Sequence, residues 1–590
     1  MRYWRALTFL RDELTVGERQ RLSLDHLAGV LSCTRRNAQI VIKKLVEEGW
    51  IRWQPGVGRG NLPTICLLKP VDSTIRQAAL SLLAQNQIER ATALLPAQER
   101  QGLLAEYLAQ HRSGHVALPT PAQHHQDVLR IPFYRGIHDL DAVQLSRRTE
   151  IHLGSSIYAG LLQRDVRSGC IEGDLAAHWE RRGDDWLITL RKGLMFHDGS
   201  SLTATEVKAH FERLKASDCT NARLFDCIER VDVLSPLCLK LVTQATPDFV
   251  PALLTQKAAG ISKVTPDGQV LGAGAFRLDE CTEWLTRLTA FEHYHGYRPW
   301  LDAVEIWNIG DRAMDFDLSS DVVHPWLVPE KTAPFSQLEA WELGCEYVLL
   351  NENRTAWMRV QKHRLRLSAF LRQLPLPESM ALSDYRVAKG MLKSETPEQS
   401  ECLPVDFVGL PAPERPLCVL TYQLRDHIAL AESLTAALNA AGIAATCCID
   451  TFPDFNRAER LAEADIIISG EVFGEDSVLS WMEWLKASTA LNVCLSTRHQ
   501  KVLYQKLETV FQFESEAERL ESFGAVERWL VESGLYRPLW QNRQQLGIRP
   551  HLNGVSLLAN GWIDFSRVVF SSPARPPESH CENGSDHPGC

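Results

Sequence analysis

The chain has 590 residues, of which 45% are hydrophobic and 23% are charged, and its formal net charge is −10. These proportions are ordinary for globular protein and exclude a collagen-like, coiled-coil or disordered structure for most of the length. The length allows about three to five domain-sized units. The 15 cysteines follow no spacing rule. We therefore expect free thiols, and neither a disulfide scaffold nor a metal or cofactor site is predicted.

The first residues do not have the pattern of a targeting segment. Arg2, Arg5 and Arg11 interrupt the apolar residues there, and Asp12 and Glu13 follow, so the apolar core of a signal peptide is missing. No run of about 18 apolar residues occurs, so no membrane span is expected. The sequence therefore predicts a cytoplasmic protein.

Charge is distributed unevenly along the chain. Residues 1–69 contain 12 Lys and Arg against 6 Asp and Glu, a net charge of +6. The other 521 residues contain 51 against 67, a net charge of −16. A small basic head on an acidic body indicates that the N-terminal end binds nucleic acid.

The basic head has the pattern of a winged helix-turn-helix. Leu24, Leu27, Ala28 and Leu31 share one helix face, and Thr34 is a suitable N-cap for a second helix. In this arrangement the second helix enters the major groove of duplex DNA. Alternating residues then predict two strands, at 50–54 and 65–68, joined by a Gly-rich turn that forms the wing. The alternative is an ordinary packed helical hairpin.

The predicted DNA contacts lie on the second helix and at the tip of the wing. Arg can bridge guanine, and Asn or Gln can bridge adenine. Lys44 is expected to neutralise phosphate, which adds affinity without sequence information. The candidate DNA-binding residues are Thr34, Arg35, Arg36, Asn37, Gln39, Lys43, Lys44 and Arg59.

The rest of the chain divides into a connector and a large body. Residues 70–115 are helical in pattern, with Pro96 between helices, and their role could be dimerisation or coverage of the head. Residues 116–127 are predicted as a linker, and 571–590 as a disordered tail. Between them, 128–570 mixes strands and helices, which predicts an α/β body of two lobes. The whole is a multidomain fold with an α+β head at 1–69.

A block in the body is similar to a known family signature. From Trp186 through Arg191, Gly193 and Phe196-His197-Asp198-Gly199 to Val207, it resembles the signature of extracellular solute-binding proteins of the oligopeptide, dipeptide and nickel type. Weaker resemblances occur at 173–179, 272–276 and 294–302. In 272–276, Ala273 and Ala275 replace the Thr and Pro of the family pattern. The resemblance implies a periplasmic-binding-protein-like body that binds solute in an interlobe cleft. The signature residues themselves are expected to be structural.

A DNA-binding head on such a body resembles the SgrR family of transcriptional regulators. The head shares that family's turn, at Cys33-Thr34-Arg35-Arg36, and its wing, at Gly58-Arg59-Gly60, and residues 561–565 resemble a further motif. The resemblance implies a regulator, in the family associated with sugar-phosphate stress and activation of a small RNA. The partners that the resemblance implies are duplex DNA, a solute such as a sugar phosphate or a peptide, and RNA polymerase if the protein is an activator.

Candidates for solute binding are few. Glu471 falls where peptide-binding relatives carry an acid that holds a ligand amine, although an ordinary surface acid is the alternative. A sugar phosphate would need Arg, because guanidinium matches phosphate bidentately, and Arg354 and Arg364 are candidates. No catalytic motif is found, so no enzyme is predicted. The alternative function is the solute receptor of an oligopeptide or dipeptide transporter.

Overall fold

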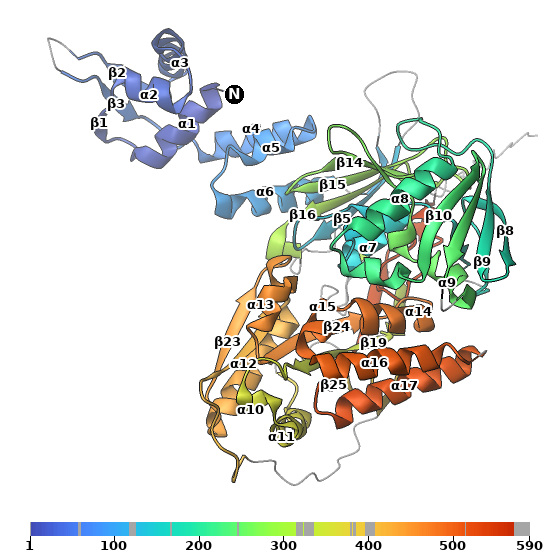
Figure 1. Ribbon diagram of the computed structural model, residues 1–590. Helices are drawn as coiled ribbons and strands as arrows, with labels where there is room; N and C mark the ends of the chain where they lie inside the picture. Colours follow the sequence, from blue (N-terminus) through green and yellow to red (C-terminus); the bar gives the residue numbers. More distant parts are fainter. Residues whose placement is uncertain are drawn as a thin grey trace, which may run out of the picture.

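The computed structural model describes residues 2–56, 61–111, 113–116, 126–165, 168–244, 247–313, 322–323, 336–377, 380, 385–395, 407–513 and 515–571. Figure 1 shows a small N-terminal head at one end, a group of helices next to it, and a body of two lobes. The predicted multidomain architecture is therefore confirmed. Arg59 at the predicted wing tip, residues 117–125 of the predicted linker and 572–590 of the predicted tail lie outside the described residues.

The head contains both predicted helices and both predicted strands of a winged helix-turn-helix. Its sheet has the antiparallel order β1-β3-β2. The helix α1 and the strand β1 were not predicted, because charged residues interrupt the apolar pattern of both. The elements are α1 (Arg2–Glu13), β1 (Arg19–Arg21), α2 (Leu24–Val30), α3 (Arg35–Glu47), β2 (Ile51–Gln54) and β3 (Thr64–Leu67).

Three helices join the head to the body, as the pattern between residues 70 and 115 predicted. They are α4 (Asp72–Ala84), α5 (Ile88–Thr92) and α6 (Ala97–Gln110), and Pro96 is the N-cap residue of α6. Their buried side chains belong to the same hydrophobic core as those of the head. The same core also includes Trp284, Leu285, Trp307 and Ile309 of the body. The helices are thus packed on both sides.

The first lobe begins with a mixed sheet that lies beside α6. The described strands have the order β14-β15-β16-β5-β4, in which β16 and β5 are parallel. Every residue of β16 is buried, which fits a strand that is covered on both faces. The helix α7 (Arg148–Ile157) packs against β14. The strands are β4 (Gly114–Val116), β5 (Gln126–Phe133), β14 (Phe276–Cys281), β15 (Leu285–Ala290) and β16 (Ala303–Asn308).

A second, antiparallel sheet of the first lobe carries the signature block. Its order is β10-β11-β9-β8, and α8 packs on β10. Phe196 and Leu190 are buried, and Gly193 and Gly199 adopt φ of +78° and +81°, which confirms the expected structural role of these residues. The elements are β8 (Ala176–Arg182), β9 (Asp185–Leu190), α8 (Ala204–Ala216), β10 (Ile228–Ser235), β11 (Cys238–Thr243) and α9 (Val250–Leu253), with short pairs at β6 (Leu162–Arg164), β7 (Ile171–Gly173), β12 (Lys263–Val264) and β13 (Val270–Leu271).

The second lobe is built on one large mixed sheet with helices around it. The described strands have the order β21-β20-β25-β19-β24-β22-β23, and β17 and β18 pair with the second half of β25. The strands are β17 (Val322–Val323), β18 (Ser336–Trp341), β19 (Gly344–Leu350), β20 (Tyr385–Ala388), β21 (Ser394–Glu395), β22 (Leu417–Tyr422), β23 (Ala445–Asp450), β24 (Ile466–Val472) and β25 (Tyr536–Ile548). The helices are α10 (Ala356–Arg359), α11 (Gln361–Arg372), α12 (Arg425–Ala440), α13 (Ala458–Ala462), α14 (Ser477–Met482), α15 (Thr489–Cys494), α16 (Thr497–Val510) and α17 (Glu516–Glu532).

The chain returns to the first lobe after β25. Leu546 and Ile548 at the end of β25 pack with Leu129 and Phe276 of the first lobe. The following segment, with β26 (Leu552–Asn553) and β27 (Val569–Phe570), belongs to the same core. The first lobe is therefore built from two segments that are far apart in the sequence. Within the described residues, no helix has the length and apolar composition that a membrane crossing requires.

Candidate DNA interface and interlobe site

The N-terminal turn of α3 is fixed by its cap. The Thr34 hydroxyl accepts a hydrogen bond from the backbone N–H of Asn37, at 3.4 Å, as the sequence predicted for an N-cap. Ala38, Ile42 and Leu45 of α3 are buried in the head. The opposite side of the helix is therefore turned away from the head.

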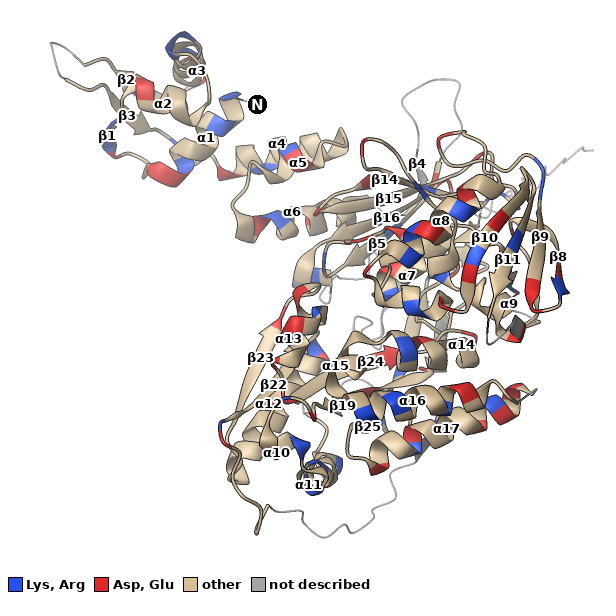
Figure 2. Ribbon diagram, viewed as in Figure 1, with Lys and Arg blue, Asp and Glu red and all other residues tan. Residues whose placement is uncertain are grey.

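Most of the predicted DNA-binding side chains are exposed on α3. Arg35, Arg36, Gln39, Lys43 and Lys44 are exposed, whereas Asn37 is half-buried. Figure 2 shows Lys and Arg on α3, and further basic residues on α1 and near β1. A basic helix surface of this kind can face the phosphates and base edges of a major groove.

Several of these cations already have partners within the head. Arg35 lies 3.6 Å from Asp25, and Lys43 lies 3.7 Å from Glu47. Lys44 lies 3.8 Å from Glu48, and its ammonium is 4.8 Å from the centre of the Tyr3 ring. In the described part of the chain, Arg36 and Gln39 have no hydrogen bond or ion pair through their side chains. These two are the most available for contact with another molecule.

Sequence reasoning missed some residues of this basic surface. Arg19 on β1 and Arg52 on β2 both pair with Cys66 of β3, so the two side chains lie on one face of the sheet. Both arginines are exposed. The run Arg19-Gln20-Arg21, in which charged and polar residues alternate, was the available signal for β1. Ile40 was also missed, because it does not belong to the apolar face of α3.

The lobes meet at a group of charged residues that we call the interlobe site: Arg147, Arg148 and Lys257 of the first lobe, and Glu471 and Glu483 of the second. Arg148 forms an ion pair of 2.8 Å with Glu342, which lies just before β19. A second ion pair, between Arg164 and Asp476, also joins the lobes. Burial lowers the pKa of Lys257, and the negative charges of Asp174 and Glu483 oppose this shift.

The two acids of the interlobe site are hard to ionise. Burial raises the pKa of Glu471 to about 8, and the neighbouring charge of Glu483 raises it further. Burial likewise raises the pKa of Glu483 to about 7, although a hydrogen bond with Gln256 of the first lobe opposes this. A cation placed between these carboxyls would remove the cost of their ionisation.

Arg147 provides the opposite charge. Its guanidinium lies 4.6 Å from the centre of the Phe452 ring, which belongs to the second lobe. Burial lowers its pKa, and the nearby charge of Arg135 lowers it further. Within the described residues Arg147 has no carboxylate ion-pair partner. An anion would therefore be stabilised beside this guanidinium. The adjacent pair Arg147-Arg148 was visible in the sequence, but nothing there distinguished it from surface charge.

Arg354 and Arg364 lie at the other end of the second lobe's sheet from Glu471. Glu471 pairs with Cys345 at the start of β19, whereas Leu350 at the end of β19 pairs with Ile466. The five residue steps from Cys345 to Leu350 separate the two ends by roughly 16 Å. Both arginines follow Leu350 in the chain. The structure therefore does not bring these three candidates together.

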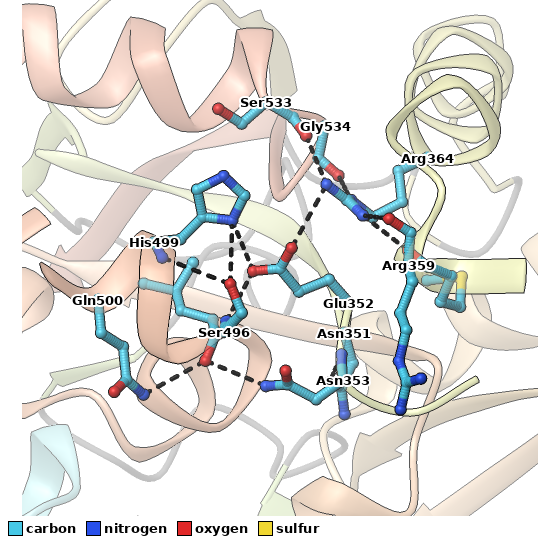
Figure 3. Close-up of polar contacts among 12 residues, drawn as sticks. Asn351, Glu352, Asn353, Arg359, Arg364, Ser496, His499, Gln500, Ser533 and Gly534 are labelled. Atoms are coloured by element: carbon cyan, nitrogen blue, oxygen red, sulfur yellow. Dashed lines mark hydrogen bonds and ion pairs between the residues drawn. The ribbon is translucent and has the colours of Figure 1, made fainter. Parts of the chain in front are cut away.

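Arg364 instead holds the second lobe together. Figure 3 shows its guanidinium directed toward backbone carbonyls and Glu352. It donates to the carbonyls of Met358, Arg359, Ser533 and Gly534, and lies 3.6 Å from Glu352. His499 Nδ1 lies 2.6 Å from the same carboxylate, and Arg354 donates to the carbonyl of Glu463. These contacts join α11, β19 and α16, which is a structural role.

Comparisons with known proteins agree with this division into a head and a body. The family "Sugar transport-related sRNA regulator N-term" matches residues 7–116. The family "Bacterial extracellular solute-binding proteins, family 5 Middle" matches residues 171–354. The regulator SgrR of Pectobacterium atrosepticum is 26% identical over 95% of this chain and 97% of its own. The chain is therefore similar to SgrR-family regulators over nearly its whole length. The Escherichia coli protein YbaE is also similar, at 25% identity over 95% of this chain and 97% of its own.

Solved structures of solute-binding proteins resemble about three quarters of the chain. The murein tripeptide binding protein MppA of Escherichia coli has a TM-score of 0.61 and 17% identity, and covers 76% of this chain and 99% of its own. A dipeptide binding protein of Pseudoalteromonas in complex with Met-Leu has a TM-score of 0.62 and 13% identity, and covers 75% of this chain and all of its own. These likenesses confirm the predicted solute-binding-protein-like fold of the body. Both matched families are named for regulation or solute binding rather than catalysis.

Proposed function

We propose that this SgrR-family regulator binds promoter DNA through α3 and that a small solute at the interlobe site changes that binding. The observation that carries the proposal is the shared core of the head, α4–α6 and the first lobe. A head packed in this way moves with the lobe that carries Arg147 and Arg148. The presence of the head also favours a regulator over the receptor of a transporter, and a cytoplasmic location follows from a DNA-binding role.

The charges of the interlobe site indicate which chemical groups a bound solute would have. Glu471 and Glu483 would favour an ammonium group, and Arg147 would favour a carboxylate or phosphate. We therefore propose a solute with both an amino group and an anionic group, as a short peptide has. A sugar phosphate is the alternative that the family resemblance suggests, and it would use Arg147 without the two acids. Arg354 and Arg364 do not enter this proposal, since they lie away from the interlobe site.

We further propose that the regulator is an activator that acts with RNA polymerase, which rests on the family resemblance. In vitro transcription from the bound promoter, with and without the protein, tests this step. An increase in transcript is expected, and a decrease would make the protein a repressor.

Footprinting of the full-length protein on the DNA upstream of its own gene tests the DNA-binding step. We expect a protected site whose affinity falls steeply with salt, because phosphate contacts release counterions. Absence of protection at low salt, with and without candidate solutes, would contradict DNA binding by the head.

A further inference from the structure

Two apolar side chains of α3 are exposed, and that of Ile40 is more exposed than that of Val46. Ile40 is 59% exposed, whereas Ala38, Ile42 and Leu45 on the other side of the helix are buried. Single exposed apolar residues are common and do not by themselves indicate a site. The neighbours of Ile40 are what distinguish it. Residues three and four apart are adjacent on a helix surface, so Ile40 lies beside Arg36, Asn37, Lys43 and Lys44. By the same rule, Gln39 lies beside Arg36 and Lys43.

Some side chains near this isoleucine have no partner among the described residues of the head. Arg35 and Lys44 are engaged with Asp25, Glu48 and the Tyr3 ring. Arg36 and Gln39 have no such side-chain partner among the described residues. We call Arg36, Gln39, Ile40 and Lys43 the reading face, in which Lys43 also has an exposed ion pair with Glu47. An isoleucine is stiff because it is β-branched, so Ile40 presents a fixed apolar shape at the edge of this face.

The chemistry of the major groove determines what such a shape can contact. Base edges there present hydrogen-bond donors and acceptors, together with one apolar group, the C5-methyl of thymine. An isoleucine that faced only donors and acceptors would bury them without a partner, which costs free energy. Thymine is therefore the base that Ile40 complements.

We propose that Ile40 contacts the C5-methyl group of a thymine and is a specificity-determining residue. This inference rests on the proposed function, in which α3 enters the major groove. Along the helix, Ile40 is one turn from Arg36. The thymine is therefore within about two base pairs of the base that Arg36 reads, given rises of about 1.5 Å per residue and 3.4 Å per base pair.

Replacement of thymine by uracil tests the contact, because it removes only the methyl group and leaves base pairing intact. Full-length protein is first used to select duplexes from a random-sequence library, and each selected thymine is then replaced in turn. At one position the wild-type protein should lose about four-fold in affinity, the value expected for one buried methyl group. Ile40→Ala should bind the thymine duplex more weakly and lose nothing further on replacement by uracil.

Two further variants make the result specific. Ile40→Val keeps a branched apolar side chain and should keep most of the sensitivity to the methyl group. Val46→Ala removes another exposed apolar side chain near the end of α3, and should keep the full four-fold loss. Circular dichroism checks that each variant is folded, and Ala is well tolerated at an exposed helix position.

The outcomes separate this inference from the proposed function. Selection of duplexes in which no thymine-to-uracil change alters wild-type affinity would overturn the role of Ile40 and leave DNA binding intact. A four-fold loss that persists in Ile40→Ala would also overturn it. Failure to select any duplex at low salt would contradict both the inference and the proposed function.

Discussion

The ring of Tyr107 on α6 lies 5.6 Å from the ring of Trp307 on β16, measured between ring centres. Tyr107 also stacks on His111 at 4.0 Å, and the backbone carbonyl of His111 accepts a hydrogen bond from Arg130 of β5. Arg130 in turn forms an ion pair of 2.8 Å with the buried Glu305. These contacts join the last helix before the body to the first lobe. We infer that the head and the first lobe move together, so that a solute changes mainly the position of the second lobe.

Removal of the Trp307 ring should loosen this junction. Trp307→Ala is expected to cost about 3–5 kcal/mol of packing free energy, as other large-to-Ala core substitutions do. Hydrogen exchange should show faster exchange of amides in α6 than in the wild type. Trp300→Ala, which removes an exposed indole from the same lobe, is the matched control and should leave α6 unchanged. Equal protection of α6 in wild type and Trp307→Ala would contradict a rigid junction.

Arg36 should contribute more to DNA recognition than its neighbour. Arg36→Ala is expected to cost about 1–3 kcal/mol of binding free energy and to relax specificity at one base pair. Arg35→Ala should cost less, because Arg35 already lies beside Asp25. Titration of selected duplexes and of their single-base variants gives both quantities. A uniform loss across all duplexes for Arg36→Ala would make it a phosphate contact instead.

Lys44 was predicted from the sequence to neutralise phosphate. If it does, Lys44→Ala should weaken all duplexes alike and reduce the slope of log affinity against log salt by about 1. Glu47→Gln, on the same helix, removes no cation and should not reduce the slope. An unchanged slope for Lys44→Ala would indicate that Lys44 serves only its contacts with Glu48 and the Tyr3 ring.

Arg364 should matter for stability and not for solute binding. Arg364→Met leaves four carbonyls and Glu352 without their guanidinium, so we expect a loss of about 3–5 kcal/mol in the free energy of unfolding. Lys362→Ala, at an exposed position of the same helix, should change stability by less than about 0.5 kcal/mol. Denaturant unfolding measures both. If the Arg364→Met protein is as stable as the wild type but no longer binds solute, then Arg364 contributes to solute binding.

The architecture could be predicted well from the sequence, because local patterns determine where its helices and strands form. Thr34 is the cap that its position before α3 suggested, and the helical spacing and the signature block led to the correct elements. The interlobe site was only partly predictable, because its residues come from α7, β24 and their neighbours, which fold together from distant parts of the chain. Arg147 and Glu483 have no local signal. Arg364 was a candidate for solute binding, and its contacts with Ser533 and Gly534 could not be predicted, because these partners are far along the sequence.

The pH dependence of stability should depend on Glu471. In the folded protein its pKa is about 8, against an ordinary value of 4.5. Between these values the folded state holds a proton that the unfolded state has released, so a rise in pH destabilises the folded state. Glu471→Gln has no proton to lose there. The melting temperature of Glu471→Gln minus that of the wild type should therefore increase as the pH is raised from about 4.5 to 8.

The same substitution at an exposed acid gives the control for this pH series. Glu432→Gln on α12 should follow the wild-type melting curve across the range. Thermal unfolding at matched ionic strength is the measurement. If Glu471→Gln and wild type keep a constant difference from pH 4.5 to 8, then Glu471 is ionised in the folded protein and its environment is not the one described.

The most direct test of the account is a DNA titration of the full-length protein with and without a bound solute. A thermal-shift screen of short peptides and sugar phosphates first identifies the solute, because a bound ligand stabilises the protein by mass action. At saturating solute we expect DNA affinity to change by about 5–150-fold, which corresponds to a coupling free energy of about 1–3 kcal/mol. Identical DNA affinities with and without saturating solute would contradict the coupling of the two sites.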